Sequence, residues 1–426
     1  MIRLIGFGST SLILALYLKK LDISESYIGY FMTITFLGDL ISSFYLSLIT
    51  DQIGRKKILL LCCVLMVITG AVFSIVENYY ILCIVAFLGI LTPSGGEVGP
   101  FRTIEQSSIA KLCNSSKDRS DIYSWYTFLG MFCGAFGAFI AGFIIDLTQK
   151  FCNFIELQSF KSVFWVYTGL AVISTILCCF ISPDIEVSKT KINDNSDIEP
   201  SETSRLIESE ITQDEPLEPV MKKRLLFNFL PQNLSSHTCM IIFKISLLFG
   251  LDSFASSLTP LSWISFYLKA KFNISSGYLG SVFFTVGIIS GLTSLGSTSM
   301  TKRLGAVITM AGTHLPASIL LAMIPLPSTM ETTLVILIAR SLLQSMDVAP
   351  KHVFLATLVD DEDRTAVFGF VNVVKTLAQI IGPSIVGIMA KDGYQWITFI
   401  IAGSLKAIYD LGILFTFITY NKHTEY

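Results

Sequence analysis

Charged residues are scarce in this sequence. They make up 15% of its 426 residues, whereas hydrophobic residues make up 52%. Soluble domains carry about a quarter charged residues, so this composition excludes an ordinary soluble globular protein. The formal net charge of −2 gives no excess of basic residues for nucleic acid, and we expect no nucleic-acid partner.

Motifs of enzymes and metal sites are also missing. The sequence has no GxxxxGK[S/T] phosphate loop, which argues against direct use of ATP. Its nine cysteines form no CxxC or Cys/His pattern, so we expect no metal and no other cofactor and interpret them as small core residues. The first residues lack the basic stretch and cleavage site of a signal peptide. The sequence therefore predicts a protein that is not an enzyme.

Long apolar runs are abundant. Runs of about 18 or more apolar residues predict transmembrane helices. We expect an all-α, polytopic membrane protein with twelve of them, at residues 2–20, 27–49, 57–77, 80–111, 121–145, 161–182, 238–268, 277–299, 304–324, 332–358, 365–390 and 395–417.

Residues 183–236 differ from the rest. Acidic residues outnumber basic ones there, and Ser, Asn and Pro are frequent, which predicts a largely disordered linker. It separates an N-terminal six-helix bundle (1–182) from a C-terminal one (237–417), with 418–426 as a tail. Lys and Arg concentrate in segments that an inside N-terminus places in the cytosol, so we expect both termini and the linker to be cytosolic.

The two halves repeat each other in three places. "YLKKLDISESYIG" (17–29) matches "YLKAKFNISSGYLG" (267–280), "EVGP" (97–100) matches "DVAP" (347–350), and "DRSDIYSW" (118–125) matches "DRTAVFGF" (363–370). Co-linear matches of this kind indicate two pseudo-symmetric bundles in tandem.

The loop after the second predicted helix carries a recognisable pattern. Asp51-x-x-Gly54-Arg55-Lys56 resembles the loop 2–3 signature of the major facilitator superfamily, although Ser47 stands where the family usually has Gly. The resemblance implies a rocker-switch secondary transporter. Helices 1, 4, 7 and 10 would line its central cavity, and helices 2, 5, 8 and 11 would form the interface between the halves.

A second motif bears on the branch of the family. "GPSIVG" (382–387) resembles the glycine-proline motif of the drug/proton antiporters, which makes that branch the nearest in motifs. The matching stretch of the first half is "GAFIAG" (137–142), where Ala138 replaces the proline. The complete antiporter motif is therefore present in the second half but not in the first.

The stretch "SGGEVGPFRTIE" (94–105) places three charges in predicted helix 4. A charge facing lipid there costs about 2.5–3.5 kcal/mol or more, so these side chains should face water, substrate or one another. Arg102 and Glu105 are three residues apart and can form a structural or gating pair. Glu97 has no partner in its own helix. We interpret it as a protonatable coupling or substrate-binding site, the alternative being a fixed buried ion pair.

Predicted helix 10 carries a polar stripe of Arg340, Gln344, Asp347 and Lys351. Their spacing puts all four on one helix face, as in residues that line a cavity. We expect Asp347 and Lys351 to pair, which leaves Arg340 for an anionic group. The alternative is a network that satisfies itself.

Predicted helices 7 and 12 add further charges. Asp252, which precedes Ser256 and Thr259 at helical spacing, is a candidate cavity carboxylate. Lys406 and Asp410 are four residues apart on a peripheral helix, and we expect them to neutralise each other.

Six residues are expected to control the conformational change. Asp51 would lie near the N-terminus of helix 11, where the helix dipole favours an anion. Gly54, Arg55 and Lys56 complete the loop signature, and Arg55 can pair with a carboxylate such as Asp118. Asp39 and Lys375 lie near the middle of helices 2 and 11, and we expect a salt bridge between them across the interface.

The linker contains Glu202-x-x-x-Leu206-Ile207, which resembles the acidic dileucine sorting signal of vacuolar or lysosomal proteins. The membrane is thus the plasma membrane or that of a vacuole or lysosome. We expect a monomeric, proton-coupled transporter of a small polar or charged organic solute or drug. The alternatives are an uncoupled facilitator and a non-transporting receptor with a transporter fold.

We expect Glu97→Gln to abolish transport driven by a proton gradient while leaving the fold intact, because the amide keeps the size of the side chain but cannot take up the proton. The check is the accumulation ratio of solute in proteoliposomes. A ratio equal to that of the parent protein would contradict this role of Glu97.

Overall fold

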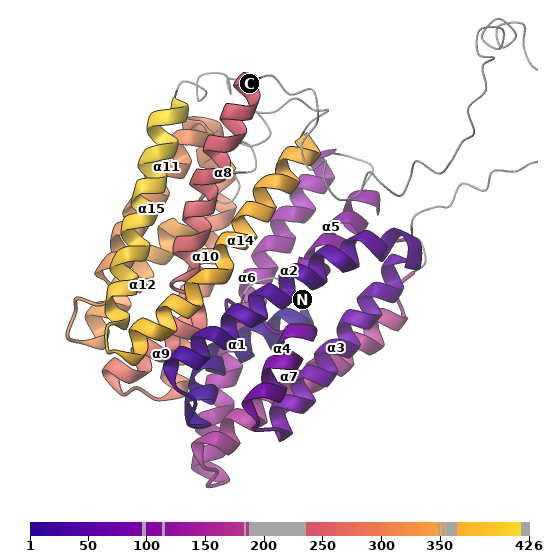
Figure 1. The fold of residues 1–426 in the computed structure, drawn as a ribbon, viewed down its shortest axis with the longest axis vertical. Helices are drawn as coiled ribbons and strands as arrows, with labels where there is room; N and C mark the ends of the chain where they lie inside the picture. Colours follow the sequence, from indigo (N-terminus) through magenta and orange to yellow (C-terminus); the bar gives the residue numbers. More distant parts are fainter. Residues whose placement is uncertain are drawn as a thin grey trace, which may run out of the picture.

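A computed structural model describes residues 1–95, 99–112, 116–182, 185–186, 236–347, 350–351, 354 and 364–418. Within these residues every regular element is a helix (Figure 1). Nine helical stretches of this described part are long and apolar enough to cross a membrane by length and composition. The all-α, polytopic architecture expected from the sequence is confirmed.

The described part of the N-terminal half, residues 1–182, contains seven helical segments. These are α1 (Ile2–Lys20), α2 (Glu25–Ile53), α3 (Arg55–Ile75), α4 (Tyr79–Leu88), α5 (Gly99–Leu112), α6 (Ser116–Phe151) and α7 (Glu156–Cys179). Because α4 and α5 share one of the expected spans, the seven segments give six passes.

The C-terminal half contains seven more segments in the part of the chain that is described. These are α8 (Ser236–Ser257), α9 (Leu261–Phe272), α10 (Ser276–Leu304), α11 (Ala306–Met323), α12 (Met330–Gln344), α14 (Arg364–Lys391) and α15 (Gln395–Phe417). Here α8 and α9 share one span, so this half also gives six passes.

The two ends of the helices define two faces of the molecule. One face carries the turns at Gly54, between α2 and α3, and at Gly305, between α10 and α11; we call it the Gly54 face. The other carries the α1–α2 turn, the α9–α10 turn at Asn273 and the α14–α15 turn at Gly393; we call it the Asn273 face.

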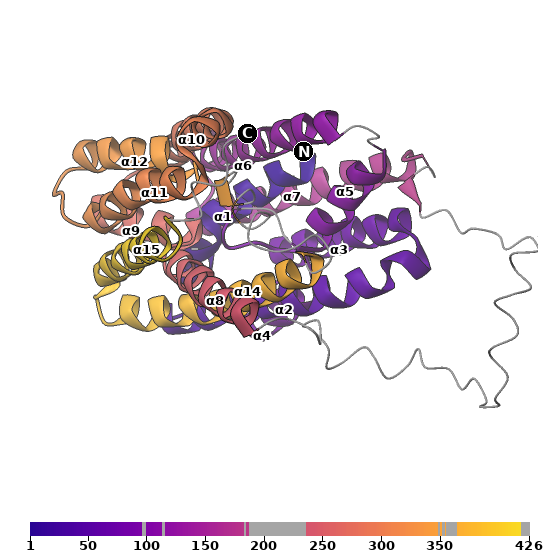
Figure 2. The same cartoon turned by 90° about the horizontal axis from the view of Figure 1, so that it is seen from above.

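The halves meet along two helix pairs. Figure 2 shows α2 beside α14 on one side of the molecule and α6 beside α10 on the other. These are helices 2, 11, 5 and 8 of the twelve passes. The interface is therefore built by the four helices that the family resemblance implies.

Each helix pair crosses at glycines. A Cβ on Gly29 of α2 would lie 2.9 Å from the Cα of Gly387 in α14, and a Cβ on Gly387 would lie 2.8 Å from the Cα of Gly29. On the other side, a Cβ on Gly280 of α10 would lie 3.2 Å from the Cα of Gly142 in α6. Only glycine allows such close backbone approach.

These four glycines belong to the repeated motifs. Gly29 and Gly280 end the first pair of matching segments, and Gly142 and Gly387 end the two glycine-rich hexapeptides. The repeat thus has a structural role. In each crossing, the first repeated segment of one half packs against the glycine-rich hexapeptide of the other half. Ala138 and Pro383 play corresponding parts, because their carbonyl oxygens lie nearest to the Cβ positions of Gly280 and Gly29.

The expected continuous helix over 80–111 is wrong. α4 ends at Leu88, and the chain is helical again only from Gly99, with residues 96–98 outside the described part. Pro93 has no N–H to donate to a helix, and Gly95 has φ +74°, outside the helical region. The carbonyl of Pro93 instead accepts hydrogen bonds from the N–H and the hydroxyl of Ser262, at 3.3 and 2.7 Å.

The continuous helices expected over 238–268 and 332–358 are also wrong. α8 ends at Ser257, and Pro260 caps α9, because a proline is accepted at the start of a helix but not inside one. α12 ends at Gln344, next to the "DVAP" repeat. α4 and α12 thus each end before the "EVGP" and "DVAP" motifs of their own half.

The broken helix 7 connects the halves. Besides its bonds to Pro93, Ser262 donates its hydroxyl to the carbonyl of Ser11 at 2.7 Å, and Ser265 donates to that of Leu12 at 2.7 Å. Nearer the Asn273 face, Asp146 of α6 accepts from the N–H of Gly277 in α10 at 3.0 Å. These contacts hold the halves together between the middle of the molecule and the Asn273 face.

We expect Gly387→Ala to push the halves apart on the Asn273 face, because the added methyl would meet the backbone of α2. The check is the rate at which cysteines placed in the central cavity react with a membrane-impermeant reagent added on that face. Gly169→Ala is the matched control, since a Cβ on Gly169 of α7 meets no atom within 4 Å. Equal labelling in the two variants would contradict the expectation.

Candidate functional site

A group of charged side chains lies inside the C-terminal half, contributed by α8, α11, α15 and the segment that follows α12. We call it the C-half cluster; its members are Asp252, His314, Asp347, Lys351, Lys406 and Asp410. Five of them, all except Asp410, line a cavity of about 350 Å³. The structure thereby places Asp252 of helix 7 beside the polar stripe of helix 10.

Two lysines hold the carboxylate of Asp252. Lys351 Nζ lies 2.9 Å from Oδ2, and Lys406 Nζ lies 2.7 Å from Oδ1. Lys351 is also 2.5 Å from Asp347 Oδ2, so the expected Asp347–Lys351 pair is present. Asp252 and Asp347 are only 8% and 4% exposed. Buried charges of this kind are stable only while they are paired.

His314 connects this network to a third carboxylate. Its Nδ1 lies 2.8 Å from Asp410 Oδ1, while Ser318 donates its hydroxyl to Asp410 Oδ2 at 3.0 Å. Its Nε2 lies 3.9 Å from a carboxylate oxygen of Asp252 and 3.9 Å from one of Asp347. With an ionised Asp410, Nδ1 carries the hydrogen, and Nε2 is then the nitrogen that can take up a proton.

The charges around the cluster nearly cancel. Its three carboxylates face the two ammonium groups of Lys351 and Lys406. The formal charge of the cluster is therefore −1 when His314 is neutral and zero when it is protonated, and Arg340 lines the same cavity. A proton on His314 thus changes the net charge of the site by one.

The cluster opens into a larger cavity between the halves, of about 550 Å³. The two cavities share six lining residues, namely Met131, Ser256, Thr259, Arg340, Gln344 and Ser345. Leu4, Arg102 and Tyr126 line the larger cavity from the N-terminal half, and Phe283 lines it from α10. Expected cavity residues of helices 4, 7 and 10 are thus brought together.

Arg340 and Gln344 face both cavities. The described residues give the guanidinium of Arg340 neither a hydrogen bond nor an ion pair. The side-chain oxygen of Gln344 is buried and has no hydrogen-bond partner in the same part of the chain. Both side chains therefore offer polar groups to a molecule in the cavity.

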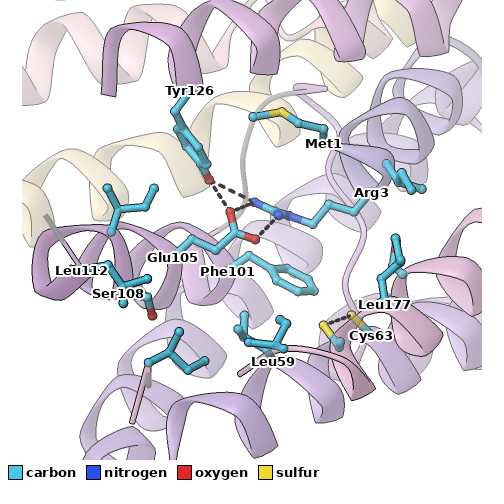
Figure 3. Close-up of a pocket in the computed structure, with 16 residues that line it drawn as sticks. Met1, Arg3, Leu59, Cys63, Phe101, Glu105, Ser108, Leu112, Tyr126 and Leu177 are labelled. Atoms are coloured by element: carbon cyan, nitrogen blue, oxygen red, sulfur yellow. Dashed lines mark hydrogen bonds and ion pairs between the residues drawn. The ribbon is translucent and has the colours of Figure 1, made fainter. Parts of the chain in front are cut away.

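A third group of polar residues lies in the N-terminal half. Arg3 of α1 forms a bidentate ion pair with Glu105 of α5, and Tyr126 of α6 donates to the same carboxylate (Figure 3). The expected Arg102–Glu105 pair is therefore wrong, since Glu105 is directed away from its own helix toward Arg3. This network fixes α5, the second part of broken helix 4, against its neighbours.

Next to this network is a cavity of about 480 Å³ with mainly apolar walls, among them Leu59, Phe101 and Leu177 (Figure 3). The guanidinium carbon of Arg3 lies 4.6 Å from the centre of the Phe101 ring. Since the charges are already matched, we interpret this group as structural.

The expected Lys406–Asp410 pair is also wrong. Lys406 reaches Asp252 and the hydroxyl of Ser256, the latter at 2.7 Å, while Asp410 binds His314. Both residues are buried, at 7% and 1% exposure, so α15 presents them to the cluster rather than to each other. Spacing along one helix gives candidate pairs, but the neighbouring helices decide which pairs form.

The sequence analysis did not single out His314 or Arg3. The signal for His314 was its position inside an apolar helix, because an ionisable residue in a membrane span is a functional candidate by default. Ser318, one turn later, is the residue that shares Asp410 with it. For Arg3 the signal was a charge at the start of the first apolar run.

The expected Asp39–Lys375 salt bridge is absent from this conformation. Asp39 accepts a hydrogen bond from Ser43 in its own helix at 3.3 Å. The ammonium of Lys375 lies 6.0 Å from the centre of the Phe249 ring. A role for these two residues in another conformation stays a prediction.

The loop signature is held by a residue that the sequence analysis did not single out. The carboxylate of Glu186 accepts hydrogen bonds from the backbone N–H groups of Arg55 and Lys56, at 2.7 and 3.1 Å. It therefore caps the N-terminus of α3, where a negative charge is favoured, and lies directly against Gly54. Lys56 donates to the carbonyls of Cys179 and Ile181, at 2.9 and 2.8 Å.

Several expectations fall on parts of the chain about which the structure says nothing. Glu97 and the sorting-signal residues Glu202, Leu206 and Ile207 lie outside the described residues, and so does nearly all of the linker. Asp51 and Asp118 lie in α2 and α6, but their side chains are not described. Their expected roles stay predictions.

Comparisons with known proteins agree with this architecture. The model of the Major Facilitator Superfamily matches residues 1–343 and 245–425. The uncharacterized membrane protein YJR124C of Saccharomyces cerevisiae is 29% identical over 412 residues, covering 96% of this chain and 90% of the yeast protein.

Two solved structures share the fold. The inward-open xylose transporter XylE from E. coli has a TM-score of 0.66 at 13% identity, covering 98% of this chain and 94% of that one. The nucleoside transporter NupG has a TM-score of 0.64 at 14% identity, covering 98% and 96%. At these identities the likeness shows the fold alone.

We expect Lys406→Met to destabilise the protein strongly, by about 3–5 kcal/mol, because it removes one of the two cations from a buried carboxylate. The check is the unfolding temperature in detergent. Lys19→Met is the matched control. It breaks the Lys19–Glu25 pair, in which the lysine is 45% exposed, and such a pair contributes about 1 kcal/mol or less. Equal shifts in the two variants would contradict a stabilising role for Lys406.

Proposed function

Since the chain belongs to the major facilitator superfamily and is a membrane transporter rather than an enzyme, we propose that it is a secondary active transporter driven by protons. Its solute would be a small polar or charged organic molecule. The observation that carries this proposal is the C-half cluster, a buried set of titratable groups whose cavity joins the cavity between the halves.

His314 is the residue that we assign to proton uptake. Asp410 and Ser318 hold its ring from one side, which leaves Nε2 directed toward Asp252 and Asp347. A proton on Nε2 would attract both carboxylates and weaken their hold on Lys351 and Lys406. Because Asp347 and Lys351 lie in the segment that follows α12, a change in their pairing would be transmitted to that segment.

The contacts between the halves support a proposal for the conformational change during transport. They lie between the middle of the molecule and the Asn273 face, and they include Ser262, Ser265 and the glycine crossings. If the Gly54 face is cytosolic, as the distribution of Lys and Arg favours, this conformation is closed to the outside. Transport would then require these contacts to break and new ones to form on the Gly54 face.

Glu97, Asp51, Asp39 and Lys375 remain part of the proposal as residues for coupling or gating. We also keep a monomer, cytosolic termini and the plasma membrane or a vacuolar or lysosomal membrane as proposals. Membership of the drug/proton antiporter branch is kept only as an alternative, because just one of the two hexapeptide motifs has the proline.

An uncoupled facilitator and a non-transporting receptor are the competing functions. Measuring proton movement in proteoliposomes loaded with the pH indicator pyranine distinguishes these functions. Organic acids, sugars and nucleosides are added one at a time. Coupled transport changes the internal pH when a solute moves. A facilitator moves solute without a matching proton flux, and a receptor moves neither.

We expect His314→Gln and Asp410→Asn to abolish the solute-driven pH change but to keep exchange of labelled for unlabelled solute, because exchange needs no net movement of protons. Ser174→Ala is the matched control, since this hydroxyl bonds only to a carbonyl of its own helix, α7. If both variants keep a normal pH change, His314 is not the coupling residue.

A further inference from the structure

Arg340 of α12 brings a positive charge to the wall of the central cavity. The described residues that line this cavity also include Arg102 from α5, which has a partner of its own, and they include no Asp or Glu. Asp252 and Asp347 line the adjoining smaller cavity, where lysines engage them. The described part of the larger space is therefore suited to a negative charge.

Arg340 is the candidate anchor for that charge. It is half-buried in the middle of the C-terminal half, and its guanidinium has no hydrogen-bond or ion-pair partner within the described residues. A cation inside a membrane protein is costly unless something pairs with it. The planar guanidinium matches carboxylate and phosphate groups, which it can bind through two parallel hydrogen bonds.

The remaining walls indicate an organic ion rather than an inorganic one. The cavity holds about 550 Å³, within the range of sites for small organic molecules. Phe283, Val286 and Leu261 supply apolar surface. The unpartnered oxygen of Gln344 and the hydroxyls of Ser256 and Thr259 supply hydrogen bonds.

We infer that the solute is a small organic anion, carrying a carboxylate or phosphate that Arg340 binds and a body that lies against Phe283 and Gln344. This inference rests on the proposed function, because it assigns a substrate class to the same cavity.

The test measures binding, so that it does not depend on proton coupling. The purified full chain is placed in nanodiscs of phosphatidylcholine, whose head group has no net charge. Its unfolding temperature is recorded with benzoate, succinate or glucose 6-phosphate and with the neutral counterparts benzamide, succinamide and glucose. We expect at least one anion to raise the unfolding temperature in a saturable manner, and its neutral counterpart to leave it unchanged.

Variants identify the site. We expect Arg340→Gln to weaken binding of that anion at least tenfold, and Arg340→Lys to weaken it less, because the charge is kept without the planar fork. Arg303→Gln is the matched control, since Arg303 is exposed at the end of α10 on the Gly54 face, and it should bind normally. Proton coupling is measured separately with pyranine, so that a failure of coupling can be told from a failure of this inference.

Three results would overturn the inference. The first is that no anion stabilises the protein, and the second is that neutral counterparts stabilise it equally. The third is that Arg340→Gln binds with parental affinity while remaining folded by its unfolding profile. Nanodiscs that contain phosphatidylserine test whether the anionic group bound at this site belongs to a lipid instead of a soluble solute. Stabilisation by this lipid with no response to any soluble anion would assign the site to a lipid head group and would also overturn it.

Discussion

The close approach of two helix backbones, made once on each side of the molecule, is the constraint on which the rest of the structure depends. Gly29 meets Gly387 and Gly142 meets Gly280 where α2 crosses α14 and α6 crosses α10. In a bilayer, apolar side chains gain little by leaving lipid for protein, so close backbone packing is a main source of helix association. These two crossings set the distance between the halves and hence the size of the cavity between them.

Broken helices and buried charges both place polar groups inside the molecule. The breaks at Pro93 and Pro260 free backbone groups, and Ser262 of the opposite half donates its N–H and its hydroxyl to the carbonyl of Pro93. A break inside a membrane protein is tolerated only where neighbouring groups or a polar cavity satisfy the backbone. The charges around Asp252 are likewise tolerated because they satisfy one another. Both features lie beside the cavity, where polar groups are accessible to a solute.

The sequence was sufficient to predict the class of fold and the number of passes, because hydropathy and a repeated motif report these directly. The interface helices followed from the resemblance to a known family. The sequence also placed Asp252 and the helix 10 stripe at the cavity. It failed for pairs of charges. Glu105 and Asp410 have partners on helices distant in sequence, Arg3 and His314, and periodicity within one helix contains no information about them. The helix breaks were missed because hydropathy joins the apolar segments on either side of Pro93 and Pro260 into single continuous runs.

Glu156 makes the contact between the halves sensitive to ionic strength, which the buried contacts do not. This carboxylate, at the start of α7 on the Asn273 face, binds Lys20 of its own half at 2.7 Å and Lys269 of the other half. It is partly exposed, at 26%, so dissolved ions can screen it. At about 0.15 M salt such attractions extend over roughly 8 Å, and over about 3 Å at 1 M. The ionic strength of the solution bathing this face would therefore shift the balance between closed and open forms, whereas the glycine crossings would be indifferent to it.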